Sequence, residues 1–155
     1  MAKEIERKFL VKSEDWKTKA YRKMDFVQGY FSSDHPTLRI RISGEKAWLT
    51  IKGRTEGISR SEHEYEIPLL DAQDMIVRFC DDRVISKQRH LVRYGEHTWE
   101  VDEFLGRHEG LVVAEIELGA EDEFFERPDW LGREVSGEVA YYNQVLAKEN
   151  EKRPN

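Results

Sequence analysis

Alternation of apolar and polar residues with a period of two recurs along this chain of 155 residues and constrains its fold more than any other feature. In the stretch TLRIRIS, an extended strand would carry Leu38 and Ile40 on one face and Arg39 and Arg41 on the other. Similar alternation predicts about eight strands, which correspond to residues 2–11, 25–33, 37–43, 46–53, 61–68, 84–94, 98–104 and 111–119.

The connections between these segments indicate how the strands are arranged. Several are short and contain Gly, such as SGEK and YGEH, which is typical of an antiparallel meander. Eight antiparallel strands can close into a barrel that leaves no strand edge exposed. We therefore predict a mainly β fold of the α+β class, a closed eight-stranded antiparallel barrel with flanking helices.

Helical spacing is confined to four stretches, which are residues 13–20, 70–80, 121–127 and 137–150. Ser13 and Asp71 are the candidate N-caps of the first two. No linker or repeat divides the chain, so we predict one domain over residues 1–150, followed by a polar tail over residues 151–155.

The opening stretch EIERKFLV also fits a helix when it is considered alone, because Glu4 and Lys8 lie four residues apart. The same alternation returns in EHEYE and AEIE, where β-branched and aromatic neighbours favour a strand. We therefore interpret the opening stretch as a strand, which places its carboxylates and its lysine on one face.

Composition excludes several classes of function. The net charge of −6 gives no electrostatic basis for binding nucleic acid, and a single cysteine, Cys80, excludes an intrachain disulfide and a cysteine zinc site. No apolar run is long enough to cross a membrane, and no signal peptide precedes Lys3, so we expect a cytoplasmic protein.

The polar faces of the predicted strands are unusual because charged residues of the same sign are paired on them. Two faces carry only cations, at 39/41 and 87/89, and three carry paired carboxylates, at 4/6, 64/66 and 115/117. A solvated sheet with ion pairs between strands would explain any one of them. For five strands at once we favour faces that point inward, with the apolar faces outside and covered by helices.

A charged interior of this kind favours a definite class of ligand. Buried charges must be paired or bound, because unpaired burial is costly. Carboxylate oxygens suit magnesium or manganese, and Arg side chains suit phosphate oxygens. No Walker-type phosphate loop or catalytic Cys/His pair is present, so the pattern indicates a complex of metal and polyphosphate held between two walls.

The motifs themselves resemble those of the CYTH family, the triphosphate tunnel metalloenzymes. EIERKFLV resembles the opening ExExK signature, and QGYF, LRIRI, LTIKG, EYEI, SKQRH, WEVDEF and AEIEL follow in the order of the family over nearly the whole chain. The resemblance implies an eight-stranded tunnel and a small-molecule triphosphate substrate, with the inorganic triphosphatases as the most similar group.

The resemblance also implies roles for particular residues. The implied metal ligands are Glu4, Glu6, Glu64, Glu66, Asp102, Glu115 and Glu117. The implied phosphate-binding residues are Lys8, Arg39, Arg41, Lys52, Lys87 and Arg89. Tyr30 and Lys52 would pair as the catalytic residues that activate water, and the cofactor would be Mg²⁺ or Mn²⁺.

Several alternatives stay open at this point. An adenylate cyclase or a thiamine triphosphatase would use the same tunnel, and a polyphosphate-binding module would use it without catalysis. The chain departs from the family where Val139 and Ala140, rather than basic residues, precede Tyr141, and Arg133 is the candidate substitute. A homodimer is also compatible with the sequence.

Overall fold

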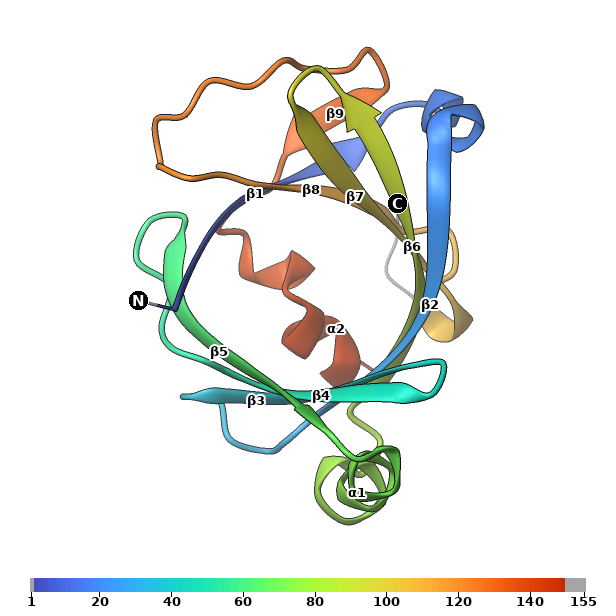
Figure 1. Cartoon of the computed structure of the whole chain (residues 1–155), viewed down its shortest axis with the longest axis vertical. Coiled ribbons are helices and arrows are strands. Elements are labelled where there is room, and N and C mark those ends of the chain that lie inside the picture. The colour runs from blue at the N-terminus through green and yellow to red at the C-terminus, as the bar shows by residue number, and fades with distance from the viewer. Residues whose placement is uncertain (1, 150–155) are drawn as a thin grey trace.

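The computed structural model describes residues 2–149 and consists mainly of one antiparallel sheet that closes on itself (Figure 1). The strands are β1 (Lys3–Val11), β2 (Ala20–Tyr30), β3 (Thr37–Ser43), β4 (Lys46–Lys52), β5 (Ser59–Ile67), β6 (Val84–Tyr94), β7 (His97–Phe104), β8 (Val112–Glu117) and β9 (Leu131–Glu134). The predicted tail, 151–155, lies outside the described residues.

Closure of the barrel depends on β1, which pairs with three other strands. The order β5-β4-β3-β2-β6-β7-β8-β1 is completed by antiparallel pairing of Lys3–Ile5 with Ser59–Ser61 of β5. Beyond that contact, the second half of β1 pairs with the short β9, so that eight strands form the barrel and β9 is added at its rim. The predicted eight-stranded barrel is confirmed.

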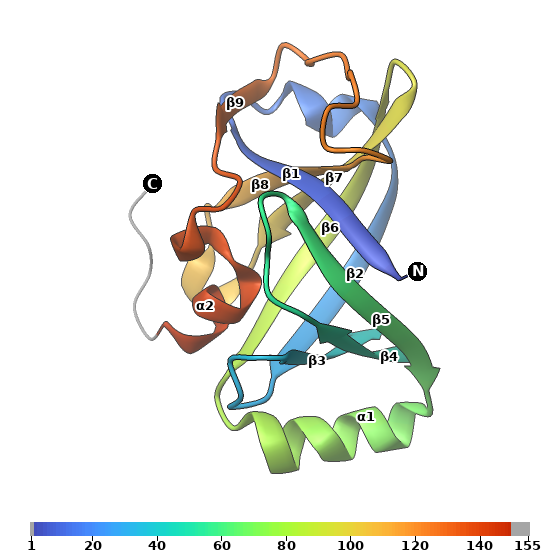
Figure 2. The same cartoon turned by 90° about the vertical axis from the view of Figure 1, so that its left-hand side faces the viewer.

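The apolar strand faces point outward and are covered from outside, as predicted. On β3 and β4, Ile40 and Ala47 are fully buried beneath α1 (Leu69–Met75), which continues into a turn of π-helix, Ile76–Cys80 (Figure 2). On the other side, Trp16 and Trp130 belong to the buried cluster that covers β1, β7 and β8. The barrel therefore has its main hydrophobic contacts outside the sheet and a charged lining inside.

Two predicted helix starts differ from the structure. The first helix is a 3₁₀ turn, Asp15–Lys19, whose N-cap is Glu14 rather than Ser13. In α1 the N-cap is Pro68, and Asp71 lies within the first turn, where its negative charge favours the helix dipole. Both errors are shifts along the chain, and neither helix lines the tunnel.

The predicted helix over residues 121–127 is wrong, because this stretch is a loop. Phe125 packs edge-on against Phe9 and Trp99, while Glu123 binds the backbone N–H of Gly119 and the ring of His97. The packing of the Phe125 ring and the hydrogen bonds of the Glu123 carboxylate thus stabilise a loop where the local spacing predicts a helix.

The closing helix is shorter than predicted and lies across one end of the tunnel rather than outside it. A 3₁₀ turn, Val139–Tyr141, precedes α2 (Asn143–Lys148), which lies over the opening of the ring in Figure 1 and to one side of the strands in Figure 2. Leu146 and Ala147 pack against inward-facing apolar residues of β6, β7 and β8, which are Ile85, Phe104 and Val113. Below this apolar end, the interior of the barrel is polar.

Candidate active site

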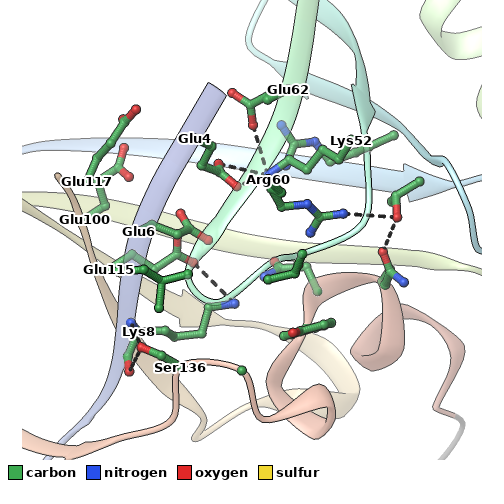
Figure 3. A pocket seen from close by; sticks show the side chains of 18 of the residues that line it. Glu4, Glu6, Lys8, Lys52, Arg60, Glu62, Glu100, Glu115, Glu117 and Ser136 are labelled. Atoms are coloured by element: carbon green, nitrogen blue, oxygen red, sulfur yellow. Dashed lines mark hydrogen bonds and ion pairs between the residues drawn. The ribbon is translucent and has the colours of Figure 1, made fainter. Parts of the chain in front are cut away.

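A cavity of about 250 Å³ lies inside the barrel and is lined almost entirely by polar and charged residues (Figure 3). Every strand from β1 to β8 except β7 contributes predicted site residues to its lining, namely Glu4, Glu6, Lys8, Tyr30, Arg39, Arg41, Lys52, Glu64, Lys87, Arg89, Glu115 and Glu117. Their alternation along the strands places them on one face, and closure of the barrel makes that face the inner one.

One wall of the cavity is acidic and is formed by β1 and β8. Glu6 pairs in register with Glu117, and Lys8 with Glu115. Burial raises the pKa of Glu6 well above its ordinary value, and the charges of Glu115 and Glu4 raise it further. Glu115 is buried too, but Lys8 and Arg89 outweigh that burial and hold its pKa below the ordinary value. Glu6 is therefore the carboxyl group that most lacks a compensating cation.

The opposite wall is basic and is formed by β3 and β6. Arg89 binds both oxygens of Asp102 through Nε and Nη2, at 2.8 and 2.9 Å, and Lys87 Nζ lies 2.6 Å from Asp102 Oδ2. Burial lowers the pKa of Lys87 to about 7, with Asp102 opposing the shift and Arg89 adding to it. Burial, together with Arg39 and Arg89, also lowers the pKa of Arg41. Glu64 and Glu100 also pair with this wall, through Arg39 and Arg89, but Arg41 has no ion-pair partner among the described residues.

Lys52 lies between the two walls. Its Nζ is 3.0 Å from Glu4 Oε2 and 3.0 Å from Glu62 Oε2, on β1 and β5. Tyr30 also lines the cavity, but among the described residues no hydrogen bond joins it to Lys52. Lys52 is instead held by the carboxylates of Glu4 and Glu62, and the joint action of Tyr30 and Lys52 on water stays a prediction.

Two predicted metal ligands are placed differently from the others. The side chain of Glu66 is exposed and lies outside the cavity lining, because the tilt of β5 carries this end of the strand toward α1. Asp102 faces inward but is fully buried behind the lining, with both oxygens bound by Arg89 and one also by Lys87. Asp102 therefore holds Lys87 and Arg89 together on the basic wall, and Glu66 is not part of the site.

Arg133, the candidate substitute for the missing basic residues, is also outside the cavity lining. Its Nη1 lies 2.6 Å from Glu138 Oε2, and both side chains are largely exposed. Lys8 instead contacts the C-terminal segment, because its Nζ donates to the backbone oxygen of Tyr141 at 3.3 Å. Lys8, a cation of β1, thus contacts the segment at Tyr141, before which the family pattern places a basic residue.

Several residues that line the cavity were not predicted from the sequence, namely Glu62, Glu100, Arg60, Asn143 and Gln144. The first three share the inward parity of predicted residues on β5 and β7, so extending the alternation would have found them. Asn143 and Gln144 come from α2, where no strand pattern applies. Asn143 Oδ1 accepts from Lys87 Nζ at 2.8 Å, and Gln144 Oε1 accepts from Thr37 Oγ1 at 2.5 Å.

The acidic wall has the donor chemistry of a site for a hard divalent cation. Glu4, Glu6, Glu115 and Glu117 supply only carboxylate oxygens, and the pairing of β1 with β8 places Glu6 directly opposite Glu117. Within residues 2–149, no three acidic, His or Cys side chains are gathered into a tight cation-binding group. The surplus of negative charge around Glu6 nevertheless fits a cation, because bringing one in would relieve the repulsion that raises its pKa.

Comparison with known proteins identifies the family. The model of the CYTH domain matches residues 2–146. The chain belongs to the CYTH family. The match agrees with the resemblance of the opening ExExK strand and with the closed barrel that the alternation predicts.

Relatives within the CYTH family extend over nearly the whole chain. An inorganic triphosphatase of Acetivibrio thermocellus is 46% identical over 149 residues, covering 96% of this chain and 95% of the relative. An inorganic triphosphatase of Nitrosomonas europaea is 32% identical, covering 93% of this chain and 96% of the relative. The crystal structure of the inorganic triphosphatase NE1496 superposes with a TM-score of 0.69 at 29% identity, over 97% of this chain and 98% of that one.

Proposed function

We propose that this CYTH protein hydrolyses inorganic triphosphate to pyrophosphate and phosphate inside the barrel. The observation that carries the proposal is a single cavity with a cationic wall facing a carboxylate wall. Both similar relatives named above are inorganic triphosphatases, which agrees with the chemistry of that cavity. No helix of the described residues is long and apolar enough to cross a membrane.

The basic wall would bind the substrate. Tripolyphosphate carries several negative charges on non-bridging oxygens, and the guanidinium groups of Arg39 and Arg41 would bind such oxygens. Arg89, whose Nε and Nη2 already hold Asp102, would contribute positive charge to the same wall. The pKa of Lys87, which burial lowers to about 7, would rise again beside a phosphate, so binding the anion restores the ammonium. Substrate would thus compensate the charge repulsion of an otherwise crowded wall.

The acidic wall would hold the cofactor, which we propose to be Mg²⁺ or Mn²⁺. Glu4, Glu6, Glu115 and Glu117 would be its protein ligands, with Glu64 contributing from β5. When bound, such a cation neutralises charge on phosphate oxygens and supplies Lewis acidity. Lys8, 3.8 Å from Glu115, would meet the phosphate at the boundary between the walls.

Hydrolysis requires water to attack the terminal phosphorus in line with the bond that breaks. A new P–O bond forms to the water oxygen, the P–O bond to the bridging oxygen breaks, and pyrophosphate departs with that electron pair and takes up the proton that the water loses. Lys52 and Tyr30 are the catalytic candidates, because each presents a donor group to the cavity from a different strand. Donors that are fixed before the reaction stabilise the charge that develops on phosphoryl oxygens.

An assay panel tests this function. Tripolyphosphate, thiamine triphosphate and ATP are each supplied with magnesium or manganese, and every product is identified. We expect tripolyphosphate to yield phosphate and pyrophosphate fastest, and excess chelator to stop the reaction. Faster formation of cyclic AMP from ATP, or turnover that persists in chelator, would contradict the proposal.

Two variants separate binding from chemistry within the same panel. Replacing Lys52 by Ala should lower kcat more than it raises KM, because Lys52 is proposed to act on the reacting phosphoryl group. Replacing Arg39 by Ala should raise KM as well, because Arg39 belongs to the basic wall. A homodimer and a cytoplasmic location stay predictions from the sequence.

A further inference from the structure

Gln28 is a fully buried amide on β2, two residues before Tyr30, and it connects three parts of the site. Its Oε1 accepts from Arg41 Nε at 2.9 Å, and its Nε2 lies 2.9 Å from the Tyr30 hydroxyl and 3.5 Å from Asn143 Oδ1. The proposed function assigns roles to Arg41 and Tyr30 but none to the amide between them.

The direction of each hydrogen bond in this network follows from the chemistry of the partners. An Arg side chain can only donate, so the atom of Gln28 that faces Arg41 must be the amide oxygen. The amide nitrogen then faces Tyr30. Lys87 fixes Asn143 in the same way, because its ammonium donates to Asn143 Oδ1 at 2.8 Å, and that oxygen therefore accepts from Gln28 as well.

The consequence falls on the Tyr30 hydroxyl group. Since Gln28 Nε2 carries hydrogen toward it, the Tyr30 oxygen accepts that bond and its own hydrogen must point elsewhere. Within residues 2–149 the structure records no acceptor for this hydrogen, and Tyr30 lines the cavity. A buried hydroxyl without an internal acceptor is directed at whatever occupies the cavity.

We propose that Gln28 is a positioning residue that holds the Tyr30 hydroxyl as a hydrogen-bond donor toward the substrate. The proposal rests on the proposed function, in which a triphosphate fills the cavity. The side-chain amide of Gln28 also holds Arg41 in position relative to Tyr30. Its contact with Asn143 connects α2 to the same hydrogen-bond network. Gln28 touches no reacting atom itself and acts only through Tyr30 and Arg41.

Kinetics of Gln28→Leu, Tyr30→Phe and the double variant test the proposal, with tripolyphosphate and magnesium. Loss of the Tyr30 donor should lower kcat about a hundredfold, as for other single donors to a developing charge. Gln28→Leu should lower kcat about tenfold and raise KM through Arg41. In the Tyr30→Phe background, Gln28→Leu should no longer affect kcat, while its effect on KM persists.

Independent effects would overturn the proposal. If Gln28→Leu lowers kcat by the same factor with Tyr or Phe at position 30, or leaves kcat unchanged, Gln28 does not act through Tyr30. Gln73→Leu, the same change at an exposed position of α1, is the control and should leave both parameters unchanged. Gln28→Glu serves as a second variant of similar shape: its carboxylate accepts from both partners, so it should lower kcat even if Gln28→Leu does not fold.

A measurement without substrate separates this inference from the proposed function. The side-chain amide resonances of Gln28, identified by their absence in Gln28→Leu, should shift in Tyr30→Phe and not in Tyr65→Phe, which changes an exposed tyrosine. Unchanged resonances in Tyr30→Phe would overturn the hydrogen bond. A wild-type protein that shows this shift but does not hydrolyse tripolyphosphate would contradict the proposed function instead.

Discussion

The two walls of the tunnel carry opposite charges and hold them in different ways. On the basic wall, Lys87 and Arg89 both bind the buried carboxylate of Asp102 through charged hydrogen bonds. On the acidic wall, Lys8 lies 3.8 Å from Glu115, but Glu6 has no cation within ion-pairing distance among the described residues. The basic wall is built into the fold, whereas the acidic wall is incomplete without a cation.

The pKa shifts express the same difference. Burial lowers the pKa of Lys87 to about 7 and raises the pKa of Glu6, so each wall moves toward neutrality when it has no ligand. A phosphate beside Lys87 and a cation beside Glu6 would each restore the charged form. The comparison suggests that the two ligands are bound as one complex, because each neutralises the charge that the other wall leaves uncompensated.

Replacing Glu6 by Gln should have the largest effect on turnover. The change removes a proposed metal ligand from the acidic wall, and we expect kcat/KM for tripolyphosphate to fall about a thousandfold, or roughly 4 kcal/mol. Glu66→Gln, the same change on an exposed carboxylate outside the cavity, should stay close to wild type. Equal losses in the two variants would remove the distinction between lining and exposed carboxylates.

Replacing Asp102 by Ala should have the largest effect on stability. It leaves Lys87 and Arg89 buried without their shared carboxylate, which costs about 3 kcal/mol of unfolding free energy. Urea unfolding measures the loss, and Asp82→Ala at an exposed position is the matched control. A stability equal to that of the control would mean that Asp102 does not hold the basic wall.

Replacing Arg60 by Ala should have a smaller effect, on substrate binding. Arg60 lines the cavity, with Nε 3.1 Å from the oxygen of Gly53 and Nη2 3.4 Å from Thr37 Oγ1, so it presents a fixed cation (Figure 3). We expect KM for tripolyphosphate to rise about tenfold with little change in kcat. Arg54→Ala, on the exposed loop nearby, should leave KM unchanged. An equal rise in KM in the two variants would mean that Arg60 does not bind the substrate.

The smallest predicted effect is a pH dependence of stability that arises from Lys87. Its folded-state pKa of about 7 lies below the ordinary value of 10.5, so between these values the unfolded chain binds more protons than the folded one. The unfolding free energy of ligand-free wild type should therefore rise with pH relative to Lys87→Met, by about 1 kcal/mol from pH 7 to pH 8. A constant difference between the two proteins would contradict the assigned shift.

Alternation along the strands predicted the barrel and the inward faces because strand parity is a local property. It placed Glu6, Arg41 and Lys87 correctly in the cavity lining without knowledge of their partners. Alternation could not predict which carboxylates of one strand face line the cavity. The tilt of β5 decides that Glu62 lines the cavity and Glu66 does not. Position along the tunnel is a property of the closed barrel.

The position of α2 could not be predicted from the sequence, for a different reason. Its last carbonyl groups are bound by side chains about 40 residues away, with His108 Nε2 2.7 Å from the oxygen of Leu146 and Arg107 donating to that of Ala147. Such contacts depend on the three-dimensional fold, and local spacing predicted only a helix. Asn143 and Gln144, which this placement brings into the site, were therefore missed.

Binding of Mn²⁺ tests most directly the claim that the acidic wall is completed by a cation. Electron paramagnetic resonance of free Mn²⁺ measures binding without catalysis, in wild type, Glu6→Gln and Glu66→Gln, each with and without tripolyphosphate. The account predicts that wild type and Glu66→Gln bind Mn²⁺, more tightly with tripolyphosphate, and that Glu6→Gln binds it far more weakly. Equal binding by Glu6→Gln and wild type, or none by wild type even with tripolyphosphate, would contradict it.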